Sequence, residues 1–277
     1  MTLLIRRKTP GSRPPKPRSS HLESGSEVCP KYKQMLFTGC PKQRTTFERI
    51  HLLIITVGAE KGGVSKTRLA THIAVLAAST GTDVVLLDTD RQGSATSWSR
   101  IRNDAGVAPA ITVLSLPPNP LKELISLSGK YELIVVDIGA QNYRTMMECA
   151  LVSDLVLVPC GADQQEVESA MKVCDDLKQK GSNHEKGEIP AHIVLTRVSP
   201  LSNATATAEL RAMLRDEGVS VFDAQLAYRT AWLTTGKSGK AVHELKGKER
   251  SPKAVAEMNA VYEEILRRIN ADTKESC

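Results

Sequence analysis

The apolar residues of this chain follow two alternating patterns between residues 50 and 270. Short runs rich in β-branched residues have the length of buried strands. Between these runs, apolar residues recur every three or four positions, as in a helix that buries one face. This alternation predicts an α/β fold, with a doubly wound, mostly parallel sheet flanked by helices in three layers. The expected strands are residues 52–57, 83–90, 110–114, 131–137, 153–159, 192–197 and 219–223.

Two further stretches give definite expectations. Residues 251–268 have an apolar stripe at helical spacing, which predicts a last helix whose apolar side faces the core. Residues 179–188 are polar and predict a surface loop, in which the single His184 is expected to be solvated.

The ends of the chain differ from the middle. Residues 1–49 are rich in Pro, Ser, Lys and Arg and have few apolar residues to bury, which predicts a disordered tail. Three interpretations of it stay open: a basic arm that contacts nucleic-acid phosphates, a solvated tail, or a reading frame that begins too early. Residues 271–277 predict a short polar tail. The folded domain is therefore expected over 50–270.

Composition narrows the class of protein. A chain of 277 residues with 41% hydrophobic and 4% aromatic residues can bury one sizeable, mostly aliphatic core. The net charge is +6, and much of this basic excess lies in the first fifty residues. The six cysteines form no C-x-x-C pair, which favours reduced thiols over a metal site. No apolar run is long enough to cross a bilayer, so we expect a cytoplasmic protein without stable membrane insertion.

A glycine-containing turn joins the first predicted strand to the first predicted helix. The turn ends in Lys66 and Thr67, and the helical pattern begins there. A strand, a turn and a helix N-terminus in this order aim backbone N–H groups and the positive end of the helix dipole at one point. That arrangement predicts a polyphosphate site, where Lys66 reaches the outer phosphates and the Thr67 hydroxyl reaches a bound Mg²⁺.

The turn reads K-G-G-x-x-K-[ST], with Glu60 and Ser65 at the positions of the two glycines of the strict Walker pattern. In this form it resembles the deviant Walker motif of ParA/MinD-type P-loop ATPases, closest to small plasmid-partition proteins. The resemblance implies that Lys61 is the signature lysine that reaches the partner's nucleotide in an ATP-bound homodimer. It also implies that the nucleotide contacts Glu60, Gly62, Gly63, Val64, Ser65, Thr67 and Arg68. If position 65 requires a positive φ, a non-glycine residue there costs about 1 kcal/mol.

Carboxylates follow two other predicted strands. Asp88 and Asp90 come at the end of one, and Asp137 ends another. Acids at the carboxyl ends of parallel strands meet beside the phosphate turn, although such acids can also cap the next helix. By the resemblance, Asp90 positions the attacking water, while Thr67, Asp88 and Asp137 serve the Mg²⁺ ion, and residues 138–141 sense the terminal phosphate. Arg91 replaces the family's proline, which removes a fixed φ from this loop.

Later residues are assigned from the same resemblance. Arg197 and the 159–163 loop, beginning at Pro159, are expected to border the adenine, unless they are an ordinary surface arginine and an ordinary loop. The stretch 229–242 resembles a region near the nucleotide and the dimer face. A basic cluster follows it, and either contacts DNA phosphates or forms a solvated face. The cluster consists of Lys246, Lys248, Arg250 and Lys253.

The resemblance implies an ATPase for plasmid or chromosome partition that uses ATP and Mg²⁺. It would dimerise with ATP, bind DNA non-specifically, associate with the nucleoid and respond to a ParB-like adaptor. Two alternatives stay open: a MinD-like or cargo-positioning ATPase that acts on a membrane or protein scaffold, and a nucleotide-gated binding module with negligible turnover. An iron–sulfur branch of the family needs paired cysteines, for which Cys149 and Cys160 alone do not suffice.

Overall fold

The computed structural model describes residues 52–116, 120–127, 129–200 and 204–275. The predicted tail, residues 1–49, lies outside the described residues. Within them the chain alternates between strands and helices along its length, as the hydrophobic pattern predicted.

Seven strands form one parallel sheet in the order β3-β2-β4-β1-β5-β6-β7. The chain starts in the middle of the sheet, builds one side with β2, β3 and β4, and then crosses to build the other side. Ligands bind parallel sheets at the carboxyl ends of the strands where the order reverses, and here that point is the end of β1. The strands are β1 (Leu53–Val57), β2 (Val84–Asp88), β3 (Thr112–Ser115), β4 (Leu133–Asp137), β5 (Leu155–Cys160), β6 (Ala191–Val198) and β7 (Leu226–Ala227).

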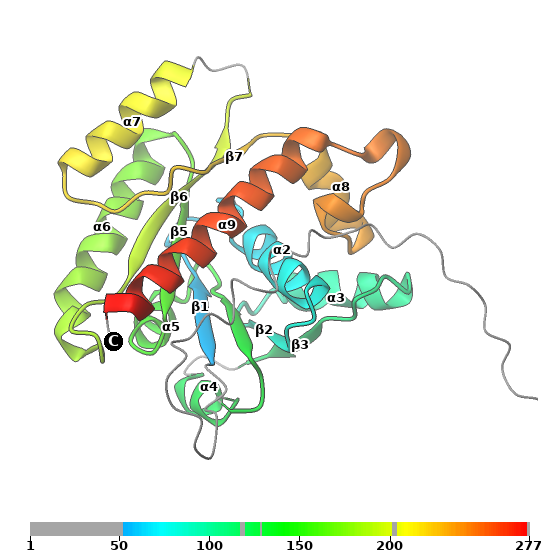
Figure 1. Ribbon diagram of the computed structural model, residues 1–277, viewed down its shortest axis with the longest axis horizontal. Helices are drawn as coiled ribbons and strands as arrows, with labels where there is room; N and C mark the ends of the chain where they lie inside the picture. The colour runs from blue at the N-terminus through cyan, green and yellow to red at the C-terminus, as the bar shows by residue number, and fades with distance from the viewer. Residues whose placement is uncertain (1–51, 117–119, 128, 201–203, 276–277) are drawn as a thin grey trace, which may run out of the picture.

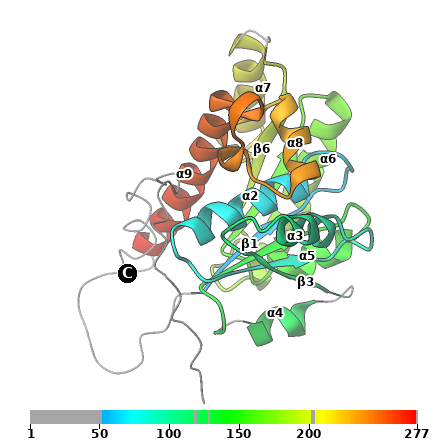
Figure 2. The same ribbon diagram turned by 90° about the vertical axis from the view of Figure 1, so that its right-hand side faces the viewer.

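Helices cover both faces of the sheet (Figures 1 and 2). One hydrophobic cluster joins a face of the sheet to α2 (Lys66–Ser79), α3 (Ser94–Asp104), α8 (Thr230–Ser238) and α9 (Pro252–Glu275). The other joins the opposite face to α4 (Leu121–Leu127), α5 (Tyr143–Ala150), α6 (Gln164–Lys180) and α7 (Ala204–Asp216). Most buried side chains in both clusters are aliphatic, as composition predicted.

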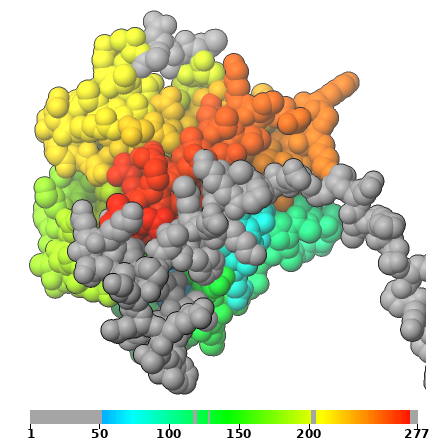
Figure 3. Space-filling model, viewed as in Figure 1, coloured from blue at the N-terminus to red at the C-terminus, as the bar shows by residue number. Residues whose placement is uncertain are grey.

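The last helix is longer than predicted. α9 begins at Pro252 and continues to Glu275, past the expected domain boundary at residue 270. Its apolar stripe faces the core, as predicted, because Met258, Val261 and Ile265 are fully buried. The C-terminal segments that include α9 spread across one face of the molecule (Figure 3).

The prediction of a strand at 219–223 is wrong. In this segment Val221 makes only an isolated bridge to Ile193, and the last strand, β7, comes later. The reason is that side chains form hydrogen bonds with backbone N–H and C=O groups that a longer pairing with β6 would need. Glu264 on α9 accepts the N–H groups of Asp223 and Ala224 at 3.1 and 2.9 Å.

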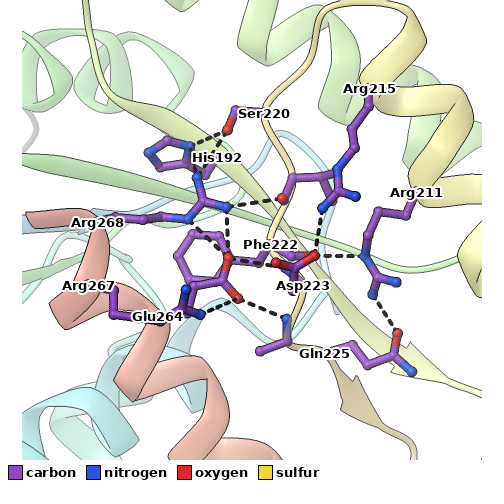
Figure 4. A network of polar contacts seen from close by, with 12 residues as sticks. His192, Arg211, Arg215, Ser220, Phe222, Asp223, Gln225, Glu264, Arg267 and Arg268 are labelled. Atoms are coloured by element: carbon purple, nitrogen blue, oxygen red, sulfur yellow. Dashed lines mark hydrogen bonds and ion pairs between the residues drawn. The ribbon is translucent and has the colours of Figure 1, made fainter. Parts of the chain in front are cut away.

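Arginines complete this arrangement around residues 221–225 (Figure 4). Arg211 on α7 donates to the Phe222 carbonyl at 2.9 Å, and Arg268 on α9 donates to the Val221 carbonyl at 3.2 Å. The Arg268 guanidinium also lies over the Phe222 ring, 4.5 Å from its centre. The segment is thus fastened between two helices, and its pairing with β6 is limited to the backbone bonds with Ile193.

The expectation of a solvated His184 is also wrong. The short 3₁₀ turn η1 (Gly181–Asn183) folds His184 inward, and its side chain is buried. Its two ring nitrogens contact the Ser153 carbonyl and the Lys186 N–H at 3.1 and 3.2 Å. A polar pattern does not reveal this, because one of the two partners, Ser153, comes from another connection of the sheet.

Candidate functional site

The connection between β1 and α2 has the backbone that the turn motif predicted. Gly63 and Ser65 both have left-handed φ angles, +75° and +74°. Ser65 occupies the N-cap of α2, yet no side chain caps this helix and its first turn has no acidic residue. The positive end of the helix dipole is therefore left for a ligand. The condition under which a non-glycine residue at position 65 is strained, a positive φ, is therefore met.

The two lysines of the motif have different environments. Lys66 is buried and donates from Nζ to the Lys61 carbonyl at 2.7 Å, across the loop. Burial lowers the pKa of Lys66, and the nearby carboxylates of Asp137 and Asp90 raise it. The side chain of Lys61 is exposed. Lys66 thus lies between the loop and the strand-end acids, whereas the Lys61 side chain is exposed to solvent.

Strand register brings the acids to one edge of the sheet. Asp137 at the end of β4 pairs with Val57 of β1 on one side and with Asp88 of β2 on the other. Neighbouring strands are about 4.8 Å apart. The 58–65 loop and both carboxylates therefore meet at one place, as the sequence predicted.

Asp137 is a buried carboxylate without a hydrogen bond. Its side chain is 1% exposed, and neither oxygen has a hydrogen-bond partner among the described residues. The pKa of Asp137 is raised to about 7, chiefly by burial and also by Asp88 and Asp90, while Thr67 and Lys66 oppose the rise. Buried polar groups are normally satisfied, so this one indicates a missing cationic or protonated partner.

Asp88 and Asp90 are held in a turn. Asp88 accepts the N–H of Asp90 on one oxygen at 3.0 Å, and the N–H and hydroxyl of Thr96 on the other at 2.8 and 2.9 Å. Its carboxylate therefore fastens α3 to the end of β2, which is the capping alternative that the sequence left open. Asp90 is partly exposed and accepts the Gln92 N–H at 2.9 Å, so one of its oxygens is used locally.

These donors fit a Mg²⁺ ion of the kind that accompanies a triphosphate. The described residues contain no group of three or more His, Cys, Asp or Glu side chains suited to a metal. Mg²⁺ in nucleotide sites needs none, because phosphate oxygens, water, one hydroxyl and one or two carboxylates complete its shell. Thr67 and the unpartnered Asp137 are the side chains that would supply the protein's share.

A pocket of about 300 Å³, including space open to solvent, is lined in part by Ser65. Arg197, predicted to border a base, is among its lining residues, whereas Pro159 is not, because it lies inside β5. Arg197 is paired with Glu166 and has a left-handed φ of +54°. The lining residues are Ser65, Arg68, Arg197, Leu226, Ala227, Tyr228, Arg229, Trp232 and Leu233.

Other motif residues contact neighbouring elements. Glu60 is exposed, and its carboxylate accepts the Ser169 hydroxyl of α6 at 3.1 Å. A Cβ added to Gly62 would lie 4.0 Å from Ala140, so the loop after β4 borders the 58–65 loop. Val64 is buried in the core, and its carbonyl accepts the Thr196 hydroxyl at 3.0 Å. Arg68 donates to the Ser65 hydroxyl at 3.3 Å.

Several residues of the site were not singled out from the sequence. Glu166 and Tyr228 at the pocket, and Thr89 and Asn142 beside Asp137, act through contacts with distant parts of the chain. Thr89 stands between Asp88 and Asp90, and its hydroxyl is the only feature of the sequence that could have marked it. The others have no local pattern that marks them.

The fold and the site together define a nucleotide-binding α/β protein of the P-loop class. A profile of the family described as CobQ/CobB/MinD/ParA nucleotide binding domain matches residues 55–242. The chain belongs to this family, whose ParA and MinD members are ATPases that act in partition or positioning. None of the described helices has the length and hydropathy of a membrane span.

One curated relative and several solved structures are similar to this chain. A ParA protein from Rhizobium radiobacter is 25% identical over 207 residues, which cover 74% of this chain and 91% of the relative. A putative plasmid partition protein from Borrelia burgdorferi B31, bound to AMPPNP, has a TM-score of 0.59 at 19% identity and covers 78% of this chain and 99% of its own.

Two other structures are similar to the same extent. The MinD cell division protein of Aquifex aeolicus has a TM-score of 0.58 at 17% identity, covering 79% of this chain and 97% of its own. An ATP complex of McdA from Cyanothece has a TM-score of 0.57 at 14% identity, with coverage of 79% and 97%. At these identities the structures support the fold alone.

Proposed function

We propose that the protein is a dimerising ATPase for plasmid or chromosome partition, which binds Mg-ATP, holds DNA non-specifically in that state and hydrolyses ATP slowly when an adaptor stimulates it. The observation that carries the proposal is the buried Asp137 carboxylate, which has no hydrogen bond and lies beside Thr67 and Lys66. A Mg²⁺ ion with a triphosphate on the uncapped N-terminus of α2 would satisfy it.

Each residue then has a defined task. Thr67 and Asp137 would hold Mg²⁺, which neutralises phosphate charge when bound. Lys66 exchanges its bond to the Lys61 carbonyl for the outer phosphates, and its buried ammonium stabilises the charge that develops there. Asp90, with one oxygen used by Gln92, orients the attacking water with the other.

The pocket beside Ser65 is the proposed site of the base. Apolar side chains of Leu226 and Leu233 offer a surface for a flat ring, and the arginines supply hydrogen-bond donors. Two of these arginines are held in place by carboxylates, Arg197 by Glu166 and Arg229 by Glu257.

Calorimetric titration of the full-length protein with Mg-ATP tests the nucleotide site. Lys66→Ala is expected to weaken binding by about 10- to 100-fold, since a charge-assisted bond to phosphate is lost. Lys178→Ala removes an exposed lysine at the end of α6 and serves as the matched control. Wild-type protein that does not bind Mg-ATP, or a Lys66→Ala variant that binds it normally, would refute the proposal.

Phosphate release separates a slow ATPase from a binding module without turnover. Wild-type protein with DNA and the candidate adaptor is expected to release phosphate faster than Lys66→Ala under the same conditions. The alternative is favoured by the strained Ser65 and by Arg91 in the loop after β2. Equal rates of phosphate release for the two proteins would establish that the protein is a binding module without turnover.

Dimerisation is proposed to depend on Lys61, whose exposed side chain is free to reach a second subunit. Light scattering with a non-hydrolysable ATP analogue should give a dimer for the wild type and a monomer for Lys61→Ala. The variant should still bind nucleotide, because the carbonyl that Lys66 uses belongs to the backbone.

The exposed basic cluster, Lys246, Lys248, Arg250 and Lys253, is the proposed DNA contact. Replacing Lys246 and Lys248 with alanine should weaken DNA binding and lower the slope of log K against log salt by about 0.9 per lost phosphate contact. Replacing Lys178 and Lys180, two exposed lysines of α6, removes the same charge and should leave the slope unchanged. Equal effects of both pairs would refute this location.

A MinD-like or cargo-positioning role remains the second candidate, since MinD and McdA structures match the fold as well as a partition protein does. Co-sedimentation with anionic liposomes or with DNA, in the presence of Mg-ATP, distinguishes the roles. Pelleting with liposomes alone would favour the second.

A further inference from the structure

Thr89 joins the two loops that follow β2 and β4. Its hydroxyl donates to the Asp137 carbonyl at 3.0 Å and accepts the N–H of Gly139 at 3.3 Å. Its backbone N–H also donates to the Asp137 carbonyl, at 3.1 Å. The side chain is 2% exposed, so water does not replace these bonds if the hydroxyl is removed.

A third contact comes from the start of α5. Asn142 occupies the N-cap of that helix, but its side chain makes no capping bond. Its amide donates instead to the Thr89 carbonyl. An N-cap asparagine normally accepts a bond from its own helix, so here the local bond is given up for one between the loops.

The joined loops determine where Asp90 lies. A Cβ added to Gly139 would lie 3.0 Å from the Cα of Asp90 and 3.1 Å from its Cβ and Cγ. Asp90 therefore rests directly on the backbone at Gly139. A displacement of the loop after β4 would move the Asp90 carboxylate with it.

We propose that Thr89 is a positioning residue: its hydroxyl makes the loops 89–93 and 138–142 move as one unit. The position of the Asp90 carboxylate is then fixed by the position of the 138–142 loop. This inference rests on the proposed ATPase function for its catalytic consequence. The mechanical part, the joining of the loops, concerns this chain alone.

Hydrogen exchange on the full-length protein without nucleotide tests the joining. Thr89→Val keeps the shape of the side chain and removes the hydroxyl, which leaves the buried Gly139 N–H without an acceptor. A peptide covering 138–142 is expected to exchange at least about tenfold faster in Thr89→Val and at the wild-type rate in Thr89→Ser. A peptide from α9 should not change in either variant. Unchanged exchange at 138–142, or equal acceleration in α9, would overturn the inference.

Asn142→Ala provides a second variant in case Thr89→Val does not fold. It removes the other side-chain bond between the loops and should accelerate the same peptide. The effects of the two substitutions are expected to be less than additive, since both weaken the same junction between the loops. Fully additive effects would mean that the two contacts act independently, and this would contradict the proposal that the two loops move as one unit.

Steady-state turnover tests the consequence for Asp90. Thr89→Val should lower kcat about tenfold or more and leave KM for Mg-ATP within about threefold of wild type, because the phosphate-binding residues are untouched. Thr89→Ser should restore kcat. A residue that only stabilises the fold would leave kcat per folded molecule unchanged. Absence of turnover in the wild type would refute the proposed ATPase, and exchange would then decide the inference alone.

Discussion

Relief of backbone strain at Ser65 offers a quantitative test of the nucleotide loop. Ser65 has φ +74° and ψ 23°, the left-handed region in which an L-residue costs about 1–2 kcal/mol relative to glycine. Ser65→Gly removes that cost but gives the unfolded chain more freedom, which offsets about 0.4–1 kcal/mol. The net stabilisation expected from losing the Cβ is therefore about 1 kcal/mol.

The hydroxyl must be separated from the Cβ. Ser65→Gly also loses the 3.3 Å bond from Arg68 to the Ser65 hydroxyl, so the proper reference is Ser65→Ala, which loses the same bond and keeps the strain. Gly63 gives the converse test, because it has φ +75° and a Cβ added there would meet nothing within 4 Å. Gly63→Ala should therefore cost about 1 kcal/mol through backbone strain alone.

Urea unfolding followed by tryptophan fluorescence measures these differences. Both tryptophans, Trp98 and Trp232, are buried, so their emission reports loss of the core. Ser65→Gly should unfold at higher urea than Ser65→Ala, with an unchanged slope and a melting temperature about 2–4 °C higher. The reasoning is refuted if Ser65→Gly is no more stable than Ser65→Ala.

Three further perturbations follow from buried groups. Because the pKa of Asp137 is raised to about 7 in the folded chain, unliganded protein loses stability as pH rises from about 4 to 7. Asp137→Asn lacks this titration, so its advantage over wild type in urea unfolding should grow by ~2–3 kcal/mol between about pH 5 and pH 8; a constant difference would contradict the assigned pKa. Gly139→Ala should lower turnover about tenfold or more, since a Cβ there approaches Asp90 to 3.0 Å, and normal turnover in a folded variant would show that Asp90 tolerates displacement. Glu244→Ala should destabilise by about 3–5 kcal/mol, because Arg102 is fully buried and paired with Glu244 at 2.7 Å. Replacing both partners with leucine should cost less than the single change, and a larger cost would show that the pair itself stabilises the fold.

Much of the candidate site was predictable, because the sequence features that mark it are local. The strand, the turn and the helix around Lys66 adjoin in sequence, so hydrophobic period and glycine placement suffice to predict them. Parallel strands deliver their ends to one edge, so Asp88, Asp90 and Asp137 could be placed together before their register was known. The sequence marked Ser65 as strained if its φ is positive, and only the structure decided that it is.

Tertiary contacts decided the parts that the sequence did not. Residues 219–223 have the composition of a strand, but Glu264 and Arg268 of α9 take some of their backbone groups, so pairing with β6 stops at one bridge. The buried His184 depends in the same way on a carbonyl from another connection.

The alternating strands and helices, the loop after β1 and the strand-end acids could be inferred from local sequence, because each depends on residues a few positions apart. Three properties appear only in the folded chain: Asp88 fastens α3, Asp137 lacks a hydrogen bond from the described residues, and Thr89 joins the two loops. Those properties depend on which distant backbone group lies within hydrogen-bonding distance of a side chain, and packing alone sets that distance.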